Sequence, residues 1–451
     1  MRIAMIGTGY VGLVSAACFA EFGVDVTAVD NDGGKIETLA RGQIPIYEPG
    51  LDDLVKRNAE AGRLTFTRDL PSAVRAAEAV FIAVGTPSRR GDGHADLTYL
   101  FAAAEEIARG LVEGSVVVTK STVPVGTGRK LQALFARVRP DLDIEVASNP
   151  EFLREGSAIE DFMRPDRVVV GVETERARQV LDRLYRPLNL TQTPIMFTSL
   201  ETAELIKYAT NSFLATKVTF INEMADLCER VGADVQALAK GLGSDGRIGT
   251  KFLHPGPGFG GSCFPKDTTA LLRIAEEANV PLRIVESVVA VNEGRKRNMV
   301  RRIIQACGGS VRGMTIAILG VTFKPNTDDV RDSPSLVIVP ALQAEGATVR
   351  AHDPEGMATA GRELPQVVWC EDMYDAMDGA DAMVVLTEWN VFRALDLERV
   401  RELLRRPIVV DLRNVYEPAE MIAAGFSYTS IGRPVIDPNA KSDGKSERKI
   451  A

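Results

Sequence analysis

Residues 3–30, IAMIGTGYVGLVSAACFAEFGVDVTAVD, decide the fold of this protein. The short apolar run from Ile3 to Ile6 predicts a buried strand, and a glycine turn from Gly7 to Gly12 follows it. The next residues, Val11 to Phe22, predict a helix, and Val24 to Val29 predicts a second strand. This order of strand, glycine turn, helix and strand is typical of the first unit of a doubly wound α/β domain.

The glycine turn predicts a dinucleotide site. Its glycines, Gly7, Gly9 and Gly12, fit the pattern GxGxxG, and Asp30 ends the next strand 18 positions later. Gly7 permits the tight turn, Gly9 lets a pyrophosphate approach the backbone, and Gly12 allows close packing of helix on strand. Because Asp30 would bind ribose hydroxyls and repel a 2′-phosphate, the sequence favours NAD over NADP, with Lys35 as a further contact. A glycine turn without a ligand is the alternative.

The alternation of strand and helix stops and then returns along the chain. Further strands are expected at Val80–Val84, Val116–Thr119, Ile144–Ala147 and Val168–Val172. A helical section follows, with helices at Leu200–Val231, Asp267–Ala278 and Pro281–Ala306 and a glycine- and proline-rich loop at Gly241–Gly261. Alternation resumes with strands at Thr315–Leu319, Val349–His352, Met383–Leu386 and Ile408–Val410 and a helix at Ser335–Ala344. We expect parallel sheets covered on both faces.

The third section echoes the first, because it again reads strand, glycine (Gly320), helix, strand and acidic residue (Asp353). The fold class predicted is therefore α/β, with two doubly wound Rossmann-like domains joined by a helical central domain. The domain boundaries that we expect are 1–198, 199–306 and 307–436, followed by a flexible polar tail over 437–451.

The composition limits the class of protein. The chain has 451 residues and a net charge of −8, with 45% hydrophobic and 25% charged residues, which is typical of a soluble globular protein. The negative charge opposes a nucleic-acid partner, and no apolar run approaches the roughly 18 residues of a membrane span. We interpret the N-terminus as mature fold rather than a signal peptide and expect a cytoplasmic protein. The five scattered cysteines predict neither a disulfide framework nor a metal site.

The second informative stretch is GFGGSCFPKD, residues 258–267. Pro265 fits the first turn of a helix, so Cys263 is expected just before a helix N-terminus, with Lys266 nearby. Both features lower the pKa of a thiol and raise its thiolate content, and Asp267 is within reach of the same place. We therefore predict a reactive Cys263, the alternative being an inert buried thiol.

Two other groups of polar residues are candidates for the site. Lys207 and Asn211 lie four residues apart on the long helix and share one face, which indicates either a polar site or a solvated surface. Glu151 follows a strand, and we expect a second carboxylate, Glu155, one helical turn beyond it, although surface carboxylates are commoner.

Threonines follow two more of the expected strands. Thr86 and Thr122 are placed where ligands of parallel sheets bind, beyond the carboxyl ends of the strands. Ordinary turn chemistry at Thr-Pro and Thr-Val-Pro is the alternative reading. The sequence alone leaves the two readings equally open.

Together these segments resemble the UDP-glucose/GDP-mannose dehydrogenase family, and within it the UDP-glucose 6-dehydrogenases. The resemblance covers roughly residues 1–435 and rests on GTGYVG (7–12), STVPVGT (121–127), SNPEFLREG (148–156), ELIKYATNSFLATKVTFINE (204–223), FLHPGPGFGGSCFPKD (252–267) and FKPNTDDVRDSP (323–334). It implies that the first domain binds NAD, that the helical domain forms a homodimer or higher oligomer, and that the third domain binds the UDP-sugar.

The resemblance also implies a role for each matching residue. Cys263 would be the nucleophile and Lys207 would steady the oxyanion. Asn211 would hold the same reacting centre, and Asp267, helped by Thr122, would orient or activate the hydrolytic water. The candidate cofactor contacts are Gly7, Gly9, Tyr10, Val11, Gly12, Asp30, Lys35, Thr86, Thr122, Glu155, Lys266 and Arg331.

The substrate contacts implied in the same way come from several segments. They are Glu151 (the family's second catalytic carboxylate), Phe152, Leu153, Arg154, Glu155, Lys207, Asn211, Arg247, Phe252, Leu253, His254, Pro255, Gly256, Gly260 and Lys324. Arg247 matches an arginine that reaches into the partner subunit's site. His254 is a departure, since some relatives carry lysine there and a neutral imidazole attracts a diphosphate less.

The reaction implied is oxidation of UDP-glucose to UDP-glucuronate with two NAD consumed. The alcohol becomes an aldehyde, the Cys263 thiolate adds to it, a second oxidation gives a thioester, and water releases the acid. The nearest alternative is the same chemistry on GDP-mannose or UDP-N-acetylmannosamine. An epimerase or lyase that recycles its NAD would need no nucleophilic cysteine. A non-catalytic NAD-binding regulator would have no reason to keep Cys263, Lys207 and Asp267 together.

Overall fold

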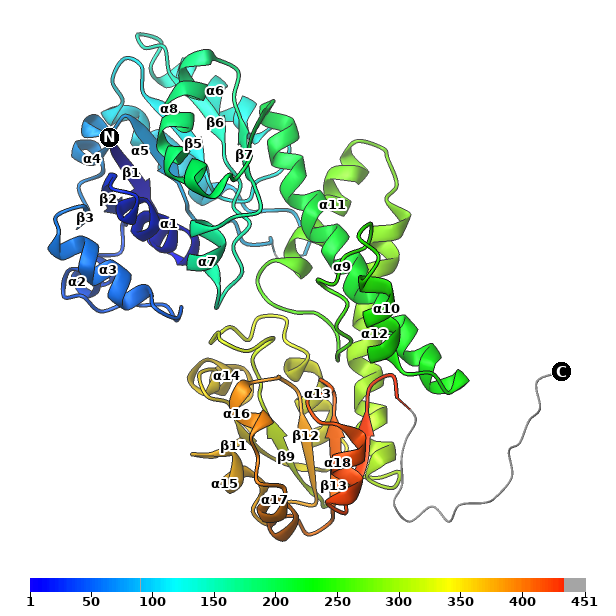
Figure 1. Ribbon diagram of the computed structural model, residues 1–451. Coiled ribbons are helices and arrows are strands. Elements are labelled where there is room, and N and C mark those ends of the chain that lie inside the picture. The colour runs from blue at the N-terminus through cyan, green and yellow to red at the C-terminus, as the bar shows by residue number, and fades with distance from the viewer. Residues whose placement is uncertain (90, 434–451) are drawn as a thin grey trace. The chain divides into compact units, whose positions relative to one another are not determined.

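The computed structural model describes residues 1–89 and 91–433, and the expected tail at 437–451 lies outside them. The chain divides into two compact units (Figure 1). The first unit contains Met1–Phe213 and Lys266–Val285, and the second contains Leu214–Pro265 and the chain from Glu286 onward. The long helix α9, Leu200–Val231, begins in the first unit and ends in the second.

The first unit is built on one large sheet with the strand order β3-β2-β1-β4-β5-β6-β7-β8. Its strands are β1 Arg2–Ile6, β2 Asp25–Val29, β3 Leu64–Thr67, β4 Ala79–Ile82, β5 Val116–Thr119, β6 Glu145–Ser148, β7 Val168–Gly171 and β8 Ile195–Thr198. Its helices are α1 Tyr10–Glu21, α2 Gly33–Ala40, α3 Leu51–Glu60, α4 Leu70–Ala76, α5 Thr98–Gly110, α6 Thr127–Val138, α7 Ala158–Met163, α8 Glu175–Tyr185, the 3₁₀ turn Arg186–Thr191 and α11 Phe264–Glu277.

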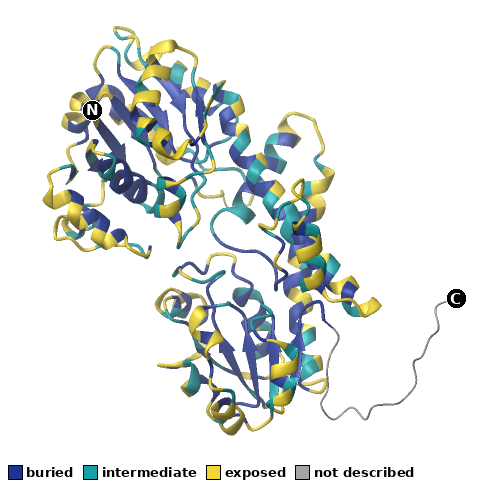
Figure 2. Ribbon diagram, in the orientation of Figure 1, coloured by how far each residue is buried: buried dark blue, intermediate teal, exposed yellow. Residues whose placement is uncertain are grey.

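Alternate residues of β1 explain why helices cover both faces of this sheet. Ile3 and Met5 belong to one buried cluster with side chains of α1 and α3, and Ala4 and Ile6 belong to another with side chains of α4, α5 and α6. A strand that is apolar on both faces must be covered on both. Figure 2 shows these strands buried and the outer helix surfaces exposed.

The second unit repeats this plan with the order β11-β10-β9-β12-β13-β14, all parallel. Its strands are β9 Thr315–Leu319, β10 Thr348–His352, β11 Val368–Trp369, β12 Ala382–Val385, β13 Ile408–Asp411 and β14 Ser427–Ser430. The helices are α10 Val235–Gly243, α12 Arg283–Ala306, α13 Ser335–Ala344, α14 Met357–Glu363, α15 Met373–Met377, α16 Asn390–Arg393, α17 Leu397–Leu403 and α18 Pro418–Ala423.

The predicted fold class is confirmed, with local corrections. The first sheet is not wholly parallel, because β7 runs antiparallel to β6 and pairs with it through Ser148 and Gly171. Helix α10 occupies the start of the expected loop at 241–261. No helix among the described residues combines the length and apolarity that crossing a bilayer demands.

Candidate active site

The glycine turn has the geometry that a dinucleotide needs. Gly7 has a φ of 100°, which favours glycine, and a Cβ there would lie 2.6 Å from the Ala83 carbonyl oxygen. A Cβ on Gly12 would lie 1.9 Å from the Gly7 carbonyl oxygen, so both positions require glycine for packing. Gly9 is the N-cap of α1, makes no side-chain cap, and a Cβ there would meet nothing within 4 Å. Open space at a helix N-terminus fits a pyrophosphate.

Asp30 lies at the end of β2, as predicted. Its carboxylate accepts hydrogen bonds from the Thr8 backbone N–H (2.9 Å), the Thr8 hydroxyl (2.8 Å) and the Asp32 N–H (3.0 Å), and Lys35 Nζ lies 3.8 Å away. Burial alone would raise the pKa of Asp30, but these donors outweigh it and hold that pKa below its ordinary value. An ionised, partly exposed acceptor at this place fits ribose hydroxyls.

The Tyr10 side chain supports a neighbouring loop, and its contact with the cofactor stays a prediction. Its hydroxyl donates to the buried Glu48, which also accepts from the Gly156 N–H (2.6 Å) and the Ala158 N–H (2.7 Å). Tyr10 and Glu48 therefore anchor the loop that ends at Gly156, and sequence reasoning missed Glu48. Val11 lies in the first turn of α1.

The Thr122 loop, residues 120–126, lies between β5 and α6. The Thr86 hydroxyl donates to the Thr122 carbonyl oxygen (2.8 Å), and the Ser121 hydroxyl donates to the Val84 carbonyl oxygen (2.6 Å). The Thr86 hydroxyl therefore supports the loop, and a contact between Thr86 and the cofactor stays a prediction. The Thr122 side chain is partly exposed, as a contact to a ligand requires.

The loop at 149–156 carries Glu151 into a buried ion pair. Lys207 Nζ lies 2.9 Å from Glu151 Oε1, and the two side chains are 3% and 6% exposed. Burial tends to raise the pKa of Glu151, but the Lys207 ammonium and the Leu153 N–H hold it below its ordinary value. The loop is not helical, so the expectation that Glu155 lies one helical turn from Glu151 is wrong.

A second buried lysine lies near this pair and was not singled out from the sequence. Lys120 Nζ donates to Asn149 Oδ1 (3.1 Å) and to the Tyr185 hydroxyl (3.3 Å). Burial lowers the pKa of Lys120 to about 8. The negative charge of Glu151 opposes this shift, and the positive charge of Lys207 lowers the pKa further. A cavity of about 40 Å³ is lined by Lys120, Asn149, Glu151, Phe152, Leu153 and Tyr185, among others. Arg154 does not line this cavity and pairs with Asp161 (2.6 Å).

Asn211 is the second polar group on the same face of α9. Its Nδ2 donates to Asp267 Oδ2 (2.6 Å), and Lys266 Nζ lies 2.7 Å from Asp267 Oδ1. Asp267 is 1% exposed and Asn211 6%. Lys207 and Asn211 are thus a buried polar site and not a solvated helix face.

In the second unit, Cys263 ends a tightly packed glycine loop and directly precedes α11. The Gly261 N–H donates to the Arg331 carbonyl oxygen (2.7 Å), and a Cβ on Gly260 would lie 2.3 Å from the Asp332 carbonyl oxygen. Cys263 is the one cysteine of the five that is not buried. By contrast, burial raises the pKa of Cys307 to about 11, so exposure distinguishes Cys263 from an inert thiol.

Helices α9 and α12 hold the preceding loop, residues 252–259. Asn222 Oδ1 accepts from the Gly256 N–H (2.8 Å), Arg295 Nε donates to the Gly256 carbonyl oxygen (2.6 Å), and Asn292 pairs with both polar groups of the Phe259 backbone. Phe252 has a φ of 66° and its ring lies 5.9 Å from that of Phe264. Leu253, Pro255 and Gly256 are buried, while His254 is exposed.

The remaining candidates of the second unit occupy separate positions. Arg247 is highly exposed and pairs with Asp245 (2.6 Å), and Arg331 pairs with Asp329 (2.7 Å). Lys324 Nζ lies 5.5 Å from the centre of the Phe323 ring. Among the described residues, no cluster of three or more His, Cys, Asp or Glu could hold a metal ion.

Comparison with known proteins decides the family. Three family models match the chain: the UDP-glucose/GDP-mannose dehydrogenase NAD binding domain over 1–189, the central domain over 201–294 and the UDP binding domain over 317–418. The chain belongs to the UDP-glucose/GDP-mannose dehydrogenase family. The resemblance inferred from the sequence and the NAD-binding first domain are thereby confirmed.

Individual relatives of the family match over nearly their whole length. The chain is 60% identical to a UDP-glucose 6-dehydrogenase of Rhizobium meliloti (strain 1021) over 436 residues, which cover 96% of this chain and 100% of the relative. It is 50% identical to UDP-glucose 6-dehydrogenase TuaD of Bacillus subtilis (strain 168), covering 98% and 95%. A solved UDP-glucose dehydrogenase of Pyrobaculum islandicum superposes with a TM-score of 0.87 at 40% identity, covering 93% and 95%.

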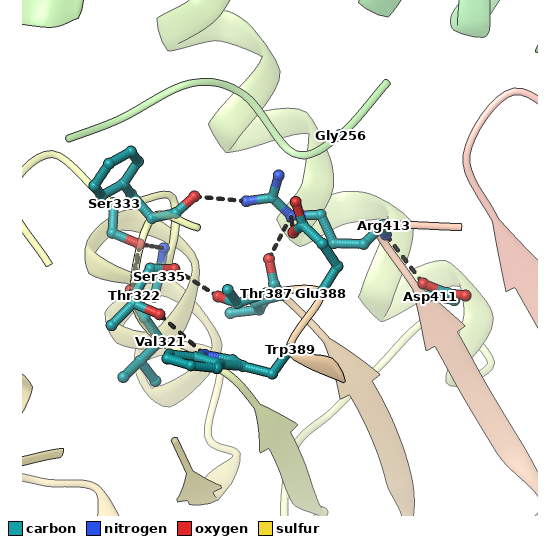
Figure 3. A network of polar contacts seen from close by, with 12 residues as sticks. Gly256, Val321, Thr322, Ser333, Ser335, Thr387, Glu388, Trp389, Asp411 and Arg413 are labelled. Atoms are coloured by element: carbon teal, nitrogen blue, oxygen red, sulfur yellow. Dashed lines mark hydrogen bonds and ion pairs between the residues drawn. The ribbon is translucent and has the colours of Figure 1, made fainter. Parts of the chain in front are cut away.

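One further residue of the family's UDP binding domain was missed from the sequence. Arg413 follows β13, and its guanidinium donates to the carbonyl oxygens of Leu386 (2.7 Å) and Phe323 (2.9 Å) (Figure 3). A Cβ on Gly256 would lie 3.2 Å from this guanidinium. Its position beyond the carboxyl end of a parallel strand is the signal that could have identified Arg413 as a candidate ligand contact.

Proposed function

We propose that this protein catalyses the NAD-dependent oxidation of UDP-glucose to UDP-glucuronate. The observation that carries the proposal is the 60% identity to the Rhizobium meliloti UDP-glucose 6-dehydrogenase over that relative's whole length. The open glycine turn and ionised Asp30 fit NAD, and the buried polar pairs on α9 fit a reaction that develops charge.

The chain's own residues divide the chemistry between them. When bound, NAD supplies the acceptor for the two hydrides that a primary alcohol can lose. Cys263 is the nucleophile: its thiolate adds to the aldehyde carbon, and after the second oxidation the same sulfur holds the acyl group as a thioester. Lys207, oriented by Glu151 at 2.9 Å, donates to the negative oxygen of these adducts.

Release of the acid needs a positioned water. Asp267 is held by Asn211 Nδ2 (2.6 Å) and Lys266 Nζ (2.7 Å), so its carboxylate has a fixed orientation from which it accepts a water proton. Thr122, on its supported loop, assists in orienting this water. Water then attacks the thioester carbon and the C–S bond breaks, which releases the product acid. The leaving sulfur takes up the proton that Asp267 had accepted, so the Cys263 thiol and the Asp267 carboxylate are both restored.

The decisive experiment compares Cys263→Ala with the parent protein. The parent should form two NADH per UDP-glucose, while the variant should form no UDP-glucuronate and bind NAD with unchanged affinity. Normal turnover by the variant would end the thioester mechanism. A panel of UDP-glucose, GDP-mannose and UDP-N-acetylmannosamine, followed by NADH absorbance, separates the substrates. Sugar conversion without net NADH would instead indicate an epimerase or lyase.

The assembly that we propose is a homodimer or a higher oligomer formed through α9. Phe213, Phe220 and Leu227 lie seven residues apart on this helix and are 65%, 46% and 51% exposed. Large apolar side chains at heptad spacing are typical of a helix that packs against another helix. Phe220→Asp should halve the mass measured by sedimentation, while Leu190→Asp, at a 91% exposed position off this helix, should not.

Several smaller predictions accompany this function. We propose the catalytic, cofactor and substrate roles residue by residue as the family resemblance implies them, together with the domain boundaries 1–198, 199–306 and 307–436, whose last residues lie outside those described. The cytoplasmic location also stays a prediction.

A further inference from the structure

Glu204 is a buried carboxylate to which the mechanism above assigns no role. It lies on α9, three residues before Lys207, and is 2% exposed. Its two carboxylate oxygens accept hydrogen bonds from two backbone groups of another helix: the Gly126 N–H at 2.6 Å and the Gly128 N–H at 2.7 Å. Burying a charged group costs free energy unless hydrogen bonds compensate it, and here the compensating donors come from another helix.

The two N–H groups belong to the start of α6. Gly126 is the N-cap of this helix, has a φ of 89° and carries no side chain that could cap it. The first N–H groups of a helix lack partners within the helix and attract negative charge. Glu204 therefore caps α6 from outside, and a Cβ on Gly128 would lie only 3.3 Å from its Oε1. The close fit leaves the carboxylate little freedom.

The capped segment is the Thr122 loop. Thr86 and Ser121 fix the beginning of the loop, as described above, and Thr127 donates through its hydroxyl to the Pro124 carbonyl oxygen (2.6 Å) within its second half. Glu204 ties this second half to α9 through buried hydrogen bonds, while Arg129 and Glu201 pair at the surface (2.7 Å). Because α9 is continuous from Glu204 to Lys207, the same contact sets where the loop lies relative to Lys207.

We propose that the ionised Glu204 carboxylate is a positioning group, which holds the Thr122 loop at a fixed place on the helix that carries Lys207. The inference rests on the proposed function for the roles of Thr122 and Lys207, but the contact itself does not depend on them. Glu204 has no direct contact with substrate or cofactor in this proposal. It acts through the loop.

The protonation of Glu204 gives this contact a pH dependence. Burial raises the pKa of Glu204 to about 7; the Gly128 and Gly126 N–H groups oppose this, Glu201 on α9 adds to it, and Arg129 on α6 opposes it. The buried phenol of Tyr208, also on α9, lies within electrostatic range of both Glu204 and Asp267. A carboxyl with a raised pKa destabilises the folded state as pH rises through that value, so the ionised cap is kept at a cost in stability. Below about pH 7 the protonated group holds two N–H groups less well.

The first test measures amide exchange, which needs no substrate. In Glu204→Gln the amide nitrogen cannot accept a hydrogen bond, so one of the two N–H groups loses its partner. At pH 8, hydrogen exchange in the peptide covering residues 122–130 should be about tenfold faster than in the parent. The matched control is Glu201→Gln, one turn earlier on α9, where the carboxylate pairs on the surface with Arg129 at 2.7 Å and exchange should be unchanged.

The second test uses the pH profile of kcat. The parent kcat should fall as pH drops through 7, while Glu204→Gln should start about tenfold lower at pH 8.5 and fall less, with little change in KM for NAD. The ratio of parent to variant kcat should therefore shrink from pH 8.5 to pH 6. A purely structural cap would leave this ratio constant, and that result, or unchanged exchange in the variant, would overturn the proposal.

Two outcomes separate this inference from the proposed function. Faster exchange in Glu204→Gln with no oxidation of UDP-glucose by the parent would refute the function and keep the contact. Should the variant not fold, exchange of the parent peptide 122–130 at pH 6 and pH 8, corrected for the intrinsic rate, replaces it. Equal corrected protection at the two pH values would then contradict the inference.

Discussion

The two sheets place an acidic residue at the same point and use it differently. Asp30 follows β2 and accepts from the backbone and hydroxyl of Thr8 in the turn after β1. Asp353 follows β10 and accepts from the Val321 N–H (2.7 Å) and from the N–H and hydroxyl of Thr322 (both 3.1 Å) in the turn after β9. The local construction is therefore the same in both domains.

The surroundings of the two carboxylates differ. Asp30 is partly exposed, whereas Asp353 is completely buried and also accepts from the Trp389 indole N–H (3.2 Å) and the Gly356 N–H (2.8 Å). Figure 3 shows the Trp389 ring beside Thr322. Asp30 is thus available to a ribose, whereas the hydrogen bonds of Asp353 all stabilise its own domain. A strand, glycine turn and acid therefore indicate the fold, while exposure of the acid indicates the ligand.

The largest effect should come from removing the second acid. Asp353→Ala leaves several buried N–H groups without an acceptor, so the free energy of unfolding should fall by about 4 kcal/mol. Urea unfolding followed by circular dichroism measures this loss. Unchanged stability would show that Asp353 does not stabilise the fold of the second unit.

Removing the first acid should affect the cofactor instead. Asp30→Ala should weaken NAD binding by 10- to 100-fold, about 1.5–3 kcal/mol, because hydrogen bonds to a charged acceptor are lost. Calorimetric titration with NAD measures the change. The urea midpoint should fall less than in Asp353→Ala, because Asp30 accepts from fewer buried donors. Asp25→Ala, at an exposed position on the same strand, is the control. A large loss of stability with normal NAD affinity would reverse the roles of the two acids.

A smaller effect is expected at the open turn. Gly9→Ala should weaken NAD binding about tenfold, because the added methyl group enters the space left for the pyrophosphate. The φ of Gly9 is −70°, so alanine fits the backbone and the fold should keep its stability. Gly241→Ala, also unobstructed but on α10, should change neither property. Normal NAD affinity in Gly9→Ala would place the pyrophosphate elsewhere.

The smallest effect should come from Trp389, the aromatic residue that donates a hydrogen bond to Asp353. Trp389→Phe keeps an aromatic ring but removes the indole N–H that reaches Asp353, so the free energy of unfolding should fall by about 1 kcal/mol. The urea midpoint again measures it. An effect as large as that of Asp353→Ala would mean that the ring, rather than the backbone donors, stabilises this carboxylate.

The sequence predicts regular elements well where the pattern is long and fails where strands are short. Helix α9 has the predicted bounds because its 32 residues contain no glycine or proline. Strands β3 and β14 were missed, since LTFT and SYTS are four-residue edge strands with polar alternation that resembles a loop. The antiparallel step between β6 and β7 depends on the path of the connection, which periodicity does not encode.

The candidate site shows the same limit. The sequence could single out the glycines, Asp30 and Cys263 as candidates because their motifs carry the chemistry in their spacing. Glu204 was missed because the sequence does not distinguish it from Glu201, which lies three residues earlier on the same helix and carries the same charge. One is buried against Gly126 and Gly128 and the other pairs with Arg129 on the surface. Which of two neighbouring carboxylates is buried depends on contacts from another helix, and these are absent from the local sequence.

The backbone of Phe252 has a consequence for the segment around Cys263. A non-glycine residue at a φ of 66° stores roughly 1–3 kcal/mol of strain, which its ring contact with Phe264 helps to hold in place. Phe264 is the first residue of α11 and the immediate neighbour of the thiol. A change in the backbone of the 252–256 loop would therefore pass through the tilted contact of the two rings to the first turn of α11, beside the Cys263 thiol.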